Sequence, residues 1–105
     1  LFIIKEELRN RRDAMIETLR AAGLTIESRH HAAPLGGIAL LARLPNGLED
    51  DEAVIDAAID MGSFSAIPGS VFGAPGCIRF GYAGIPAQDI HRLADRLPEV
   101  FDAVS

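Results

Sequence analysis

The sequence has very little cysteine and no long apolar run, and each shortage excludes a class of protein. Its single cysteine, Cys77, excludes an internal disulfide framework and a cysteine-rich zinc site. Such sparing use of cysteine suits a reducing compartment, so we predict a cytoplasmic protein. No apolar run approaches the ~18 residues that a membrane-spanning helix needs, so we expect no membrane association.

Basic clusters and metal-ligating clusters are equally scarce. The formal net charge is −5 at pH 7, and the arginines are spread from Arg9 to Arg96 rather than gathered into a stripe. This distribution argues against nucleic acid as a partner. His30 and His31 are adjacent, so in a strand they point to opposite faces, and His91 is far along the chain. We therefore expect polar surface histidines and no metal site.

What is present is enough for one folded domain. The chain has 105 residues, of which 49% are hydrophobic and 24% are charged, as in ordinary globular domains. A chain of this length buries something over ~60% of its unfolded surface, which allows one modest core. We treat residues 1–105 as a single domain. Because Leu1 and its apolar neighbours lead straight into a charged helix, we expect a longer parent chain or a removed upstream segment.

Hydrophobic periodicity and turn residues predict seven elements, in the order helix, strand, strand, helix, strand, strand, helix. The predicted ranges are helix 5–22, strands 24–29 and 38–44, helix 49–62, strands 63–67 and 77–83, and a helix from 86 to the end. Pro98 interrupts the last helix, where we expect a kink or break. The order predicts an α/β (α+β) fold, with a small mixed β-sheet and helices packed mainly on one face.

Two groups of chemically active residues have structural interpretations. Asp50, Asp51 and Glu52 are helix-start charges, with Asp50 or Asp51 as the cap, rather than an acid–base pair. Cys77 is interpreted as a small packing residue. The helix predicted at 49–62, which starts with these acids, is expected to have an apolar stripe of Val54, Ile55, Ala58 and Ile59.

Arg79 stands inside an otherwise apolar strand. Side chains alternate across a strand, so Arg79 lies on the face opposite Ile78 and Phe80, which are expected to lie under the helices. Its companions on that strand face are all small: Cys77, Gly81 and Ala83. Small companions leave space beside the guanidinium for a ligand or another domain. A structural ion pair or simple exposure to solvent remains open for this arginine.

A glycine-rich loop, Pro68–Gly76, precedes the arginine strand. It lacks the Gly-Lys-Ser/Thr ending of a phosphate-binding P-loop, and no helix follows it. Its glycines and prolines favour a tight connection between two strands.

The order of features from Asp51 onward resembles the C-terminal small domain of fold-type I pyridoxal-phosphate aminotransferases, in the aspartate aminotransferase-like (class I/II) group. The resemblance lies in an acidic-capped helix, a Gly, a short strand, a PGxxFG loop and a hydrophobic-Arg strand, in the stretch DDEAVIDAAIDMGSFSAIPGSVFGAPGCIRFGYA. Upstream, LRNRRDAMIETLRAAGLTI resembles the helix that leads into that domain, and APLGGIALLARLP resembles the strand that follows. Ile38 and Ala39 depart from the aromatic residue that the family often has there, and SFSAI departs from its usual GVxVxPG.

The resemblance implies roles for three residues. Arg79 would grip the α-carboxylate of an amino acid or 2-oxo acid substrate, and Ser70 and Phe72 would lie near the substrate entrance. A guanidinium fork matches a carboxylate bidentately, and such a grip holds the substrate's Cα–H perpendicular to the cofactor ring. Plain loop packing remains open for Ser70 and Phe72.

The resemblance also implies a pyridoxal 5′-phosphate cofactor held by a domain that is absent here. The family's Schiff-base lysine, its acidic partner for the pyridine nitrogen and its phosphate cup belong to the large domain. The only lysine here, Lys5, lies outside any matching motif. We therefore predict a transferase of amino acid metabolism in which the large domain of the same chain is a partner and the full enzyme is a homodimer. Residues 1–105 would hold no catalytic, cofactor-binding or metal-binding residue and would be inactive alone.

Two other functions remain open. One is a non-catalytic α/β binding or dimerisation module, and the other is the ligand-sensing domain of an aminotransferase-like transcription regulator. Sequence upstream of Leu1 would distinguish them: a cofactor-lysine motif favours the enzyme, a winged helix favours the regulator, and a true start favours the module.

Overall fold

The structure is a computed structural model that describes residues 5–28, 39–64, 66–82, 85 and 87–105. Several sequence predictions fall outside these residues. They are the adjacent histidines His30 and His31, the turn at 34–37, and Pro86 as the first residue of the last helix.

Three helices frame the domain. They are α1 (Lys5–Ala21), α2 (Asp51–Asp60) and α3 (Ala87–Val104), close to the predicted ranges. Gly23, just after α1, has φ +93°, and Gly62, just after α2, has φ +62°, as expected of glycines that end helices. Of the kink or break expected near Leu97, the break is wrong, because α3 continues through Pro98 to Val104, and the kink stays a prediction. The buried stripe that runs along both halves of α3 holds them together: Ile90, Leu93, Leu97, Val100 and Phe101.

The described strands form one sheet in the order β1 (Thr25–Ser28), β2 (Ala39–Arg43), β4 (Cys77–Gly81), β3 (Ile67–Pro68). Each of the three pairings is antiparallel. The strand predicted at 63–67 is wrong in position, because among the described residues of this stretch only Ile67 and Pro68 pair with β4. Ser63 follows the end of α2, and its amide donates to the carbonyl of Ala58 in that helix. Pro68 has no N–H, which suits the short edge strand β3.

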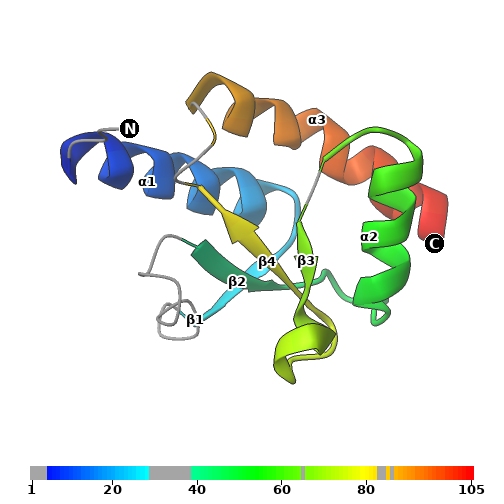
Figure 1. Cartoon of the computed structure of the whole chain (residues 1–105). Coiled ribbons are helices and arrows are strands. Elements are labelled where there is room, and N and C mark those ends of the chain that lie inside the picture. The colour runs from blue at the N-terminus through cyan, green and yellow to red at the C-terminus, as the bar shows by residue number, and fades with distance from the viewer. Residues whose placement is uncertain (1–4, 29–38, 65, 83–84, 86) are drawn as a thin grey trace.

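The helices pack on one face of the sheet, as predicted. Figure 1 shows α1 and α3 side by side across the sheet, with α2 beside the C-terminal half of α3. From the sheet, Leu40, Ala42, Ile78 and Phe80 join one hydrophobic cluster with residues of all three helices. Full burial of a leucine, isoleucine or phenylalanine side chain contributes about 1.5–3 kcal/mol to the stability of the fold.

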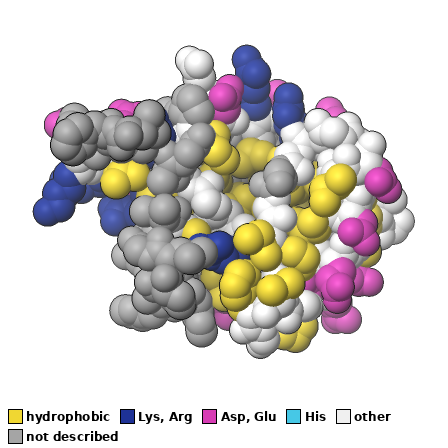
Figure 2. All heavy atoms as spheres, viewed as in Figure 1, with side chains coloured by type: hydrophobic (Ala, Val, Ile, Leu, Met, Phe, Trp, Pro, Cys, Tyr) yellow, Lys and Arg dark blue, Asp and Glu magenta, His cyan; other side chains and the backbone are white. Residues whose placement is uncertain are grey.

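One predicted core residue is outside the core. Val54, Ile55 and Ala58 of α2 are buried, but Ile59 is 59% exposed. The apolar stripe of α2 is therefore narrower than its sequence predicts. Other large exposed apolar side chains follow Ile59 along the chain: Met61, Ile67, Val71 and Phe72. Figure 2 shows hydrophobic side chains gathered over β3 and the turn that follows it.

Candidate substrate-carboxylate site

Arg79 occupies the centre of β4 and faces away from the helices. Its register partners are Leu41 on β2 and Ile67 on β3, so the guanidinium lies between two apolar neighbours. The small companions expected on its own strand are thus joined by larger residues of the neighbouring strands, which strand pairing brings beside Arg79. Arg79 is half-buried, and its backbone is held by strands on both sides.

Phe72 closes one side of the arginine. The Cζ atom of Arg79 lies 5.4 Å from the centre of the Phe72 ring, within the distance for a cation–π interaction. Within the described part of the chain, this ring contact is the one interaction found for the guanidinium. Phe72 itself is 51% exposed, so the pair lies at the surface.

The loop before β4 is compact. It begins with a single 3-10 turn, η2 (Gly69–Phe72), and then turns back at Gly73, which has φ +78°. Gly69 lies where a side chain does not fit, because a Cβ there would be 2.3 Å from the carbonyl oxygen of Ala74. The loop therefore follows a path that depends on glycine at its first residue and at its turning point.

Asp51 holds both ends of this loop. It is the first residue of α2 and is only 2% exposed. Its carboxylate accepts hydrogen bonds from the Ser70 amide at 2.9 Å, the Ser70 hydroxyl at 2.8 Å and the Gly76 amide at 2.9 Å. The neighbouring Asp50 is the helix cap, since its side chain accepts a hydrogen bond from the Ala53 amide at 3.0 Å. The two adjacent aspartates thus have separate tasks.

The electrostatics of Asp51 favour its charged form. Burial is the largest single influence and raises the pKa of the carboxyl. The hydrogen bonds from the amides of Gly76 and Ser70 and from the Ser70 hydroxyl act together in the opposite direction, and the pKa of Asp51 lies below its ordinary value. A buried carboxylate is tolerated because these donors replace the water that it has lost.

The three residues predicted for the site are placed in two groups. Arg79 and Phe72 are in contact, whereas the hydroxyl of Ser70 points to Asp51 and is engaged there. The sequence predicted only a helix-start charge at Asp51 and not its contacts with the loop. The only available signal was the pairing of two acids at a helix start, where one residue is enough for the cap.

Solved structures that share this fold include several aminotransferases. The Thermus thermophilus aspartate aminotransferase with maleate is 25% identical with a TM-score of 0.72, over 91% of this chain and 23% of that one. The Thermotoga maritima aspartate aminotransferase is 21% identical with a TM-score of 0.71, over 92% and 24%. A Pyrococcus horikoshii kynurenine aminotransferase is 23% identical with a TM-score of 0.72, over 95% and 25%.

Residues 4–97 match the family described as aminotransferase class I and II. The chain belongs to this aminotransferase family. No curated protein matches the sequence significantly. The family match and the shared fold confirm the resemblance and the fold class predicted from the sequence. The chain spans about a quarter of the length of the aminotransferase structures that it matches.

Aminotransferases of this family depend on pyridoxal phosphate, and the residues that the structure describes do not fit that cofactor. The only lysine, Lys5, is exposed at the start of α1, the helix that packs on the opposite side of the sheet from Arg79. Among the described residues, the surroundings of Arg79 are Leu41, Ile67 and Phe72, which supply neither a Schiff-base amine nor an acidic partner for a pyridine nitrogen.

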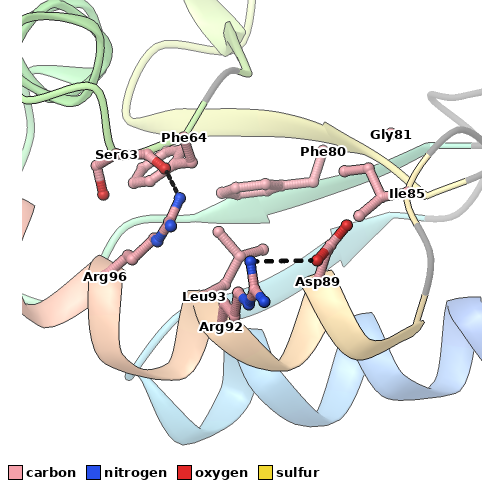
Figure 3. Close-up of a pocket in the computed structure, with 9 residues that line it drawn as sticks. All are labelled: Ser63, Phe64, Phe80, Gly81, Ile85, Asp89, Arg92, Leu93 and Arg96. Carbon is pink, nitrogen blue, oxygen red and sulfur yellow. Dashed lines mark hydrogen bonds and ion pairs between the residues drawn. The ribbon is translucent and has the colours of Figure 1, made fainter.

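A cavity of about 350 Å³ lies elsewhere in this aminotransferase domain, between α3 and the helix-facing side of β4. Figure 3 shows the Phe64 and Phe80 rings on its floor and Arg92 and Arg96 reaching from α3. Both arginines are engaged: Arg92 pairs with Asp89 at 3.6 Å, and Arg96 donates to the Ser63 carbonyl. Arg79 points to the other face of the sheet, so this cavity is separate from the candidate site.

The remaining candidate groups are remote from this chemistry. Cys77 is fully buried, and burial raises the pKa of its thiol, as expected of a packing residue. His91 is exposed on α3. In the described ranges, no three metal-ligating side chains gather into a group that would hold an ion. None of the described helices combines the length and apolar character that crossing a bilayer requires.

Proposed function

We propose that residues 1–105 are the C-terminal small domain of a pyridoxal-phosphate-dependent aminotransferase, in which Arg79 binds the α-carboxylate of the amino acid and of the 2-oxo acid. The observation that carries this proposal is Arg79 itself. It is a half-buried arginine at the centre of a strand, with an aromatic ring on one side and no acidic partner among the described residues. An arginine in that state has donors to offer to a ligand.

The physical basis is the shape of the guanidinium. Its planar fork makes two parallel hydrogen bonds to a carboxylate, which fix both the position and the orientation of the bound acid. The strand pairing on both sides of Arg79 keeps its backbone in place. A substrate held in this way presents its Cα–H in one direction, and such positioning supplies a large share of the rate acceleration in enzymes.

The rest of the active site, in this proposal, comes from a larger chain. The cofactor lysine, the acidic partner of the pyridine nitrogen and the phosphate site lie in a large domain, and the complete enzyme is a cytoplasmic homodimer. Two observations support a larger enzyme. The chain spans about a quarter of the aminotransferases that it matches, and several large apolar side chains around Arg79 are exposed: Ile67, Val71 and Phe72.

The test is replacement of Arg79 in a complete enzyme that carries this domain. Arg79→Ala removes charge-assisted hydrogen bonds worth about 1.5–3 kcal/mol each, so kcat/KM for the amino acid falls at least about 100-fold. Arg79→Lys keeps the charge but loses the fork, and its kcat/KM lies between those of the wild type and Arg79→Ala. Arg92→Ala, which removes an exposed arginine from the other side of the domain, is the matched control. An Arg79→Ala enzyme with unchanged steady-state kinetics would disprove the assignment.

A further inference from the structure

The Asp51 carboxylate connects three segments that are far apart in the sequence. Ser70 is 19 residues away and Gly76 is 25 residues away, and the two stand at opposite ends of the loop. A single side chain thus ties the start of α2 to both ends of the loop that carries Phe72. The three donors to this carboxylate all belong to the loop, so their hydrogen bonds hold the two ends of the loop together.

The loop controls where Phe72 lies. Phe72 is the last residue of η2, and Ser70 belongs to the same turn. Because the ring is half exposed, packing alone does not fix its position, and the backbone beneath it must do so. The hydrogen bonds that Ser70 donates to Asp51 anchor that turn. The hydrogen bond that the Gly76 amide donates anchors the residue just before β4, the strand of Arg79.

We propose that Asp51 is a positioning residue for Arg79: by holding both ends of the 69–76 loop, it seats the Phe72 ring against the guanidinium and so sets the direction in which Arg79 presents its donors. The value of this arrangement for catalysis rests on the proposed function. A ring on one side of a guanidinium restricts its rotation, and a pre-oriented fork loses less freedom when it binds a carboxylate.

The decisive experiment observes Arg79 directly in the 105-residue chain. The side-chain Nε–H resonance of Arg79, identified by its loss in Arg79→Lys, is sensitive to the ring current of Phe72. Phe72→Leu defines the resonance position without the ring. We expect Asp51→Asn to move the resonance toward that position, because an amide cannot accept all three hydrogen bonds as a carboxylate does.

The chain provides a matched control next to Asp51. Asp50→Asn removes the same charge one residue earlier, and asparagine is as good a helix cap as aspartate. We expect this variant to leave the Arg79 resonance at its wild-type position. Ser70→Ala removes one of the three bonds and should move the resonance in the same direction by a smaller amount. If Asp51→Asn does not fold, the Ser70→Ala resonance decides whether Asp51 positions Arg79.

Two outcomes would overturn the proposal. Either the Asp51→Asn and Ser70→Ala resonances coincide with that of Asp50→Asn, or Phe72→Leu leaves the Arg79 signal unmoved. In a complete enzyme, Asp51→Asn should lower kcat/KM by between about 10-fold and 100-fold, chiefly by raising KM. The upper figure is the cost of misplacing a substrate-positioning group by about 1 Å. If Arg79→Ala leaves the kinetics unchanged, the proposed function fails, whereas the resonance still decides whether Asp51 positions Arg79.

Discussion

At Gly69 the backbone passes so close to its neighbours that any side chain would collide with them. A Cβ there would lie 2.3 Å from the Ala74 carbonyl oxygen and 2.7 Å from that of Cys77. Both are backbone atoms of the loop and of β4, so neither moves without disturbing the site. The requirement for glycine here is steric, since the positive-φ glycines lie elsewhere in the chain.

We therefore expect Gly69→Ala to lower the free energy of unfolding by about 1–3 kcal/mol, as overpacking does in other proteins. Urea unfolding followed by circular dichroism measures the change. Gly81→Ala is the matched control, because a Cβ at Gly81 meets nothing within 4 Å, and its effect should stay within about 0.5 kcal/mol. Equal stability of the two variants would contradict this account of the loop.

Residue by residue, the sequence predicted the face of Arg79 but not its neighbours. Strand alternation alone places Arg79 opposite Phe80, and the structure agrees. The contact with Phe72 depends on how the loop curls back, and strand pairing decides that Leu41 and Ile67 flank the arginine. The carboxylate-binding role of Arg79, and any substrate contact by Ser70 or Phe72, stay predictions.

Among the elements, α3 departs most from its expected form. Pro98 lies on its exposed side and has no amide to donate to the carbonyl of Ala94, four residues earlier. The helix continues because the buried stripe, which includes Leu97 and Val100, pays for the missing bond.

Pro98→Ala restores that bond and should raise the free energy of unfolding by about 2–2.6 kcal/mol. A proline inside a helix costs about 3 kcal/mol relative to alanine, offset by about 0.4–1 kcal/mol because proline also restricts the unfolded chain. Glu99→Ala, at the next exposed position, should change stability by less than about 0.5 kcal/mol. A Pro98→Ala protein that unfolds at lower urea than the wild type would show that the proline is needed in α3.

The long helices and the buried central strand were predicted well from sequence patterns, and the short edge strand was not. The helices and the central strand β2 are close to their predicted ranges because periodicity over several turns, or burial on both faces, marks them. The strand predicted at 63–67 failed because alternation over five residues is a weak signal. The Ser63 amide donates back to Ala58 in α2, and pairing with β4 selects Ile67 and Pro68 instead.

For the molecule as a whole, the principal feature is an arginine site without the groups that a pyridoxal-phosphate reaction requires. The only lysine is on α1, and the sheet separates α1 from the face that carries Arg79. The apolar side chains around Arg79 give that face the character of an interior surface rather than of a solvated one.

We expect the 105-residue chain to leave the absorbance spectrum of added pyridoxal phosphate unchanged at one-to-one stoichiometry and to transfer no amino group. The reason is that Lys5 is exposed at the start of α1, on the opposite side of the sheet from Arg79. Lys5→Arg is the control, and its spectrum should coincide with that of the wild type. A one-to-one spectral change that Lys5→Arg abolishes would mean that this chain carries a cofactor site of its own.

The sequence by itself determined the three helices and their ends, the buried central strand, the glycine-dependent loop and the face on which Arg79 lies. These features follow from forces that act within one or two turns of the chain: alternation, helical periodicity, capping and the freedom of glycine. Only the tertiary structure decided that Ile59 is exposed, that Phe72 covers Arg79, and that Asp51 reaches the loop rather than its own helix end. Each of these depends on how α2 docks beside β3 and β4, across 19 to 25 residues of intervening chain, and no local pattern specifies that docking.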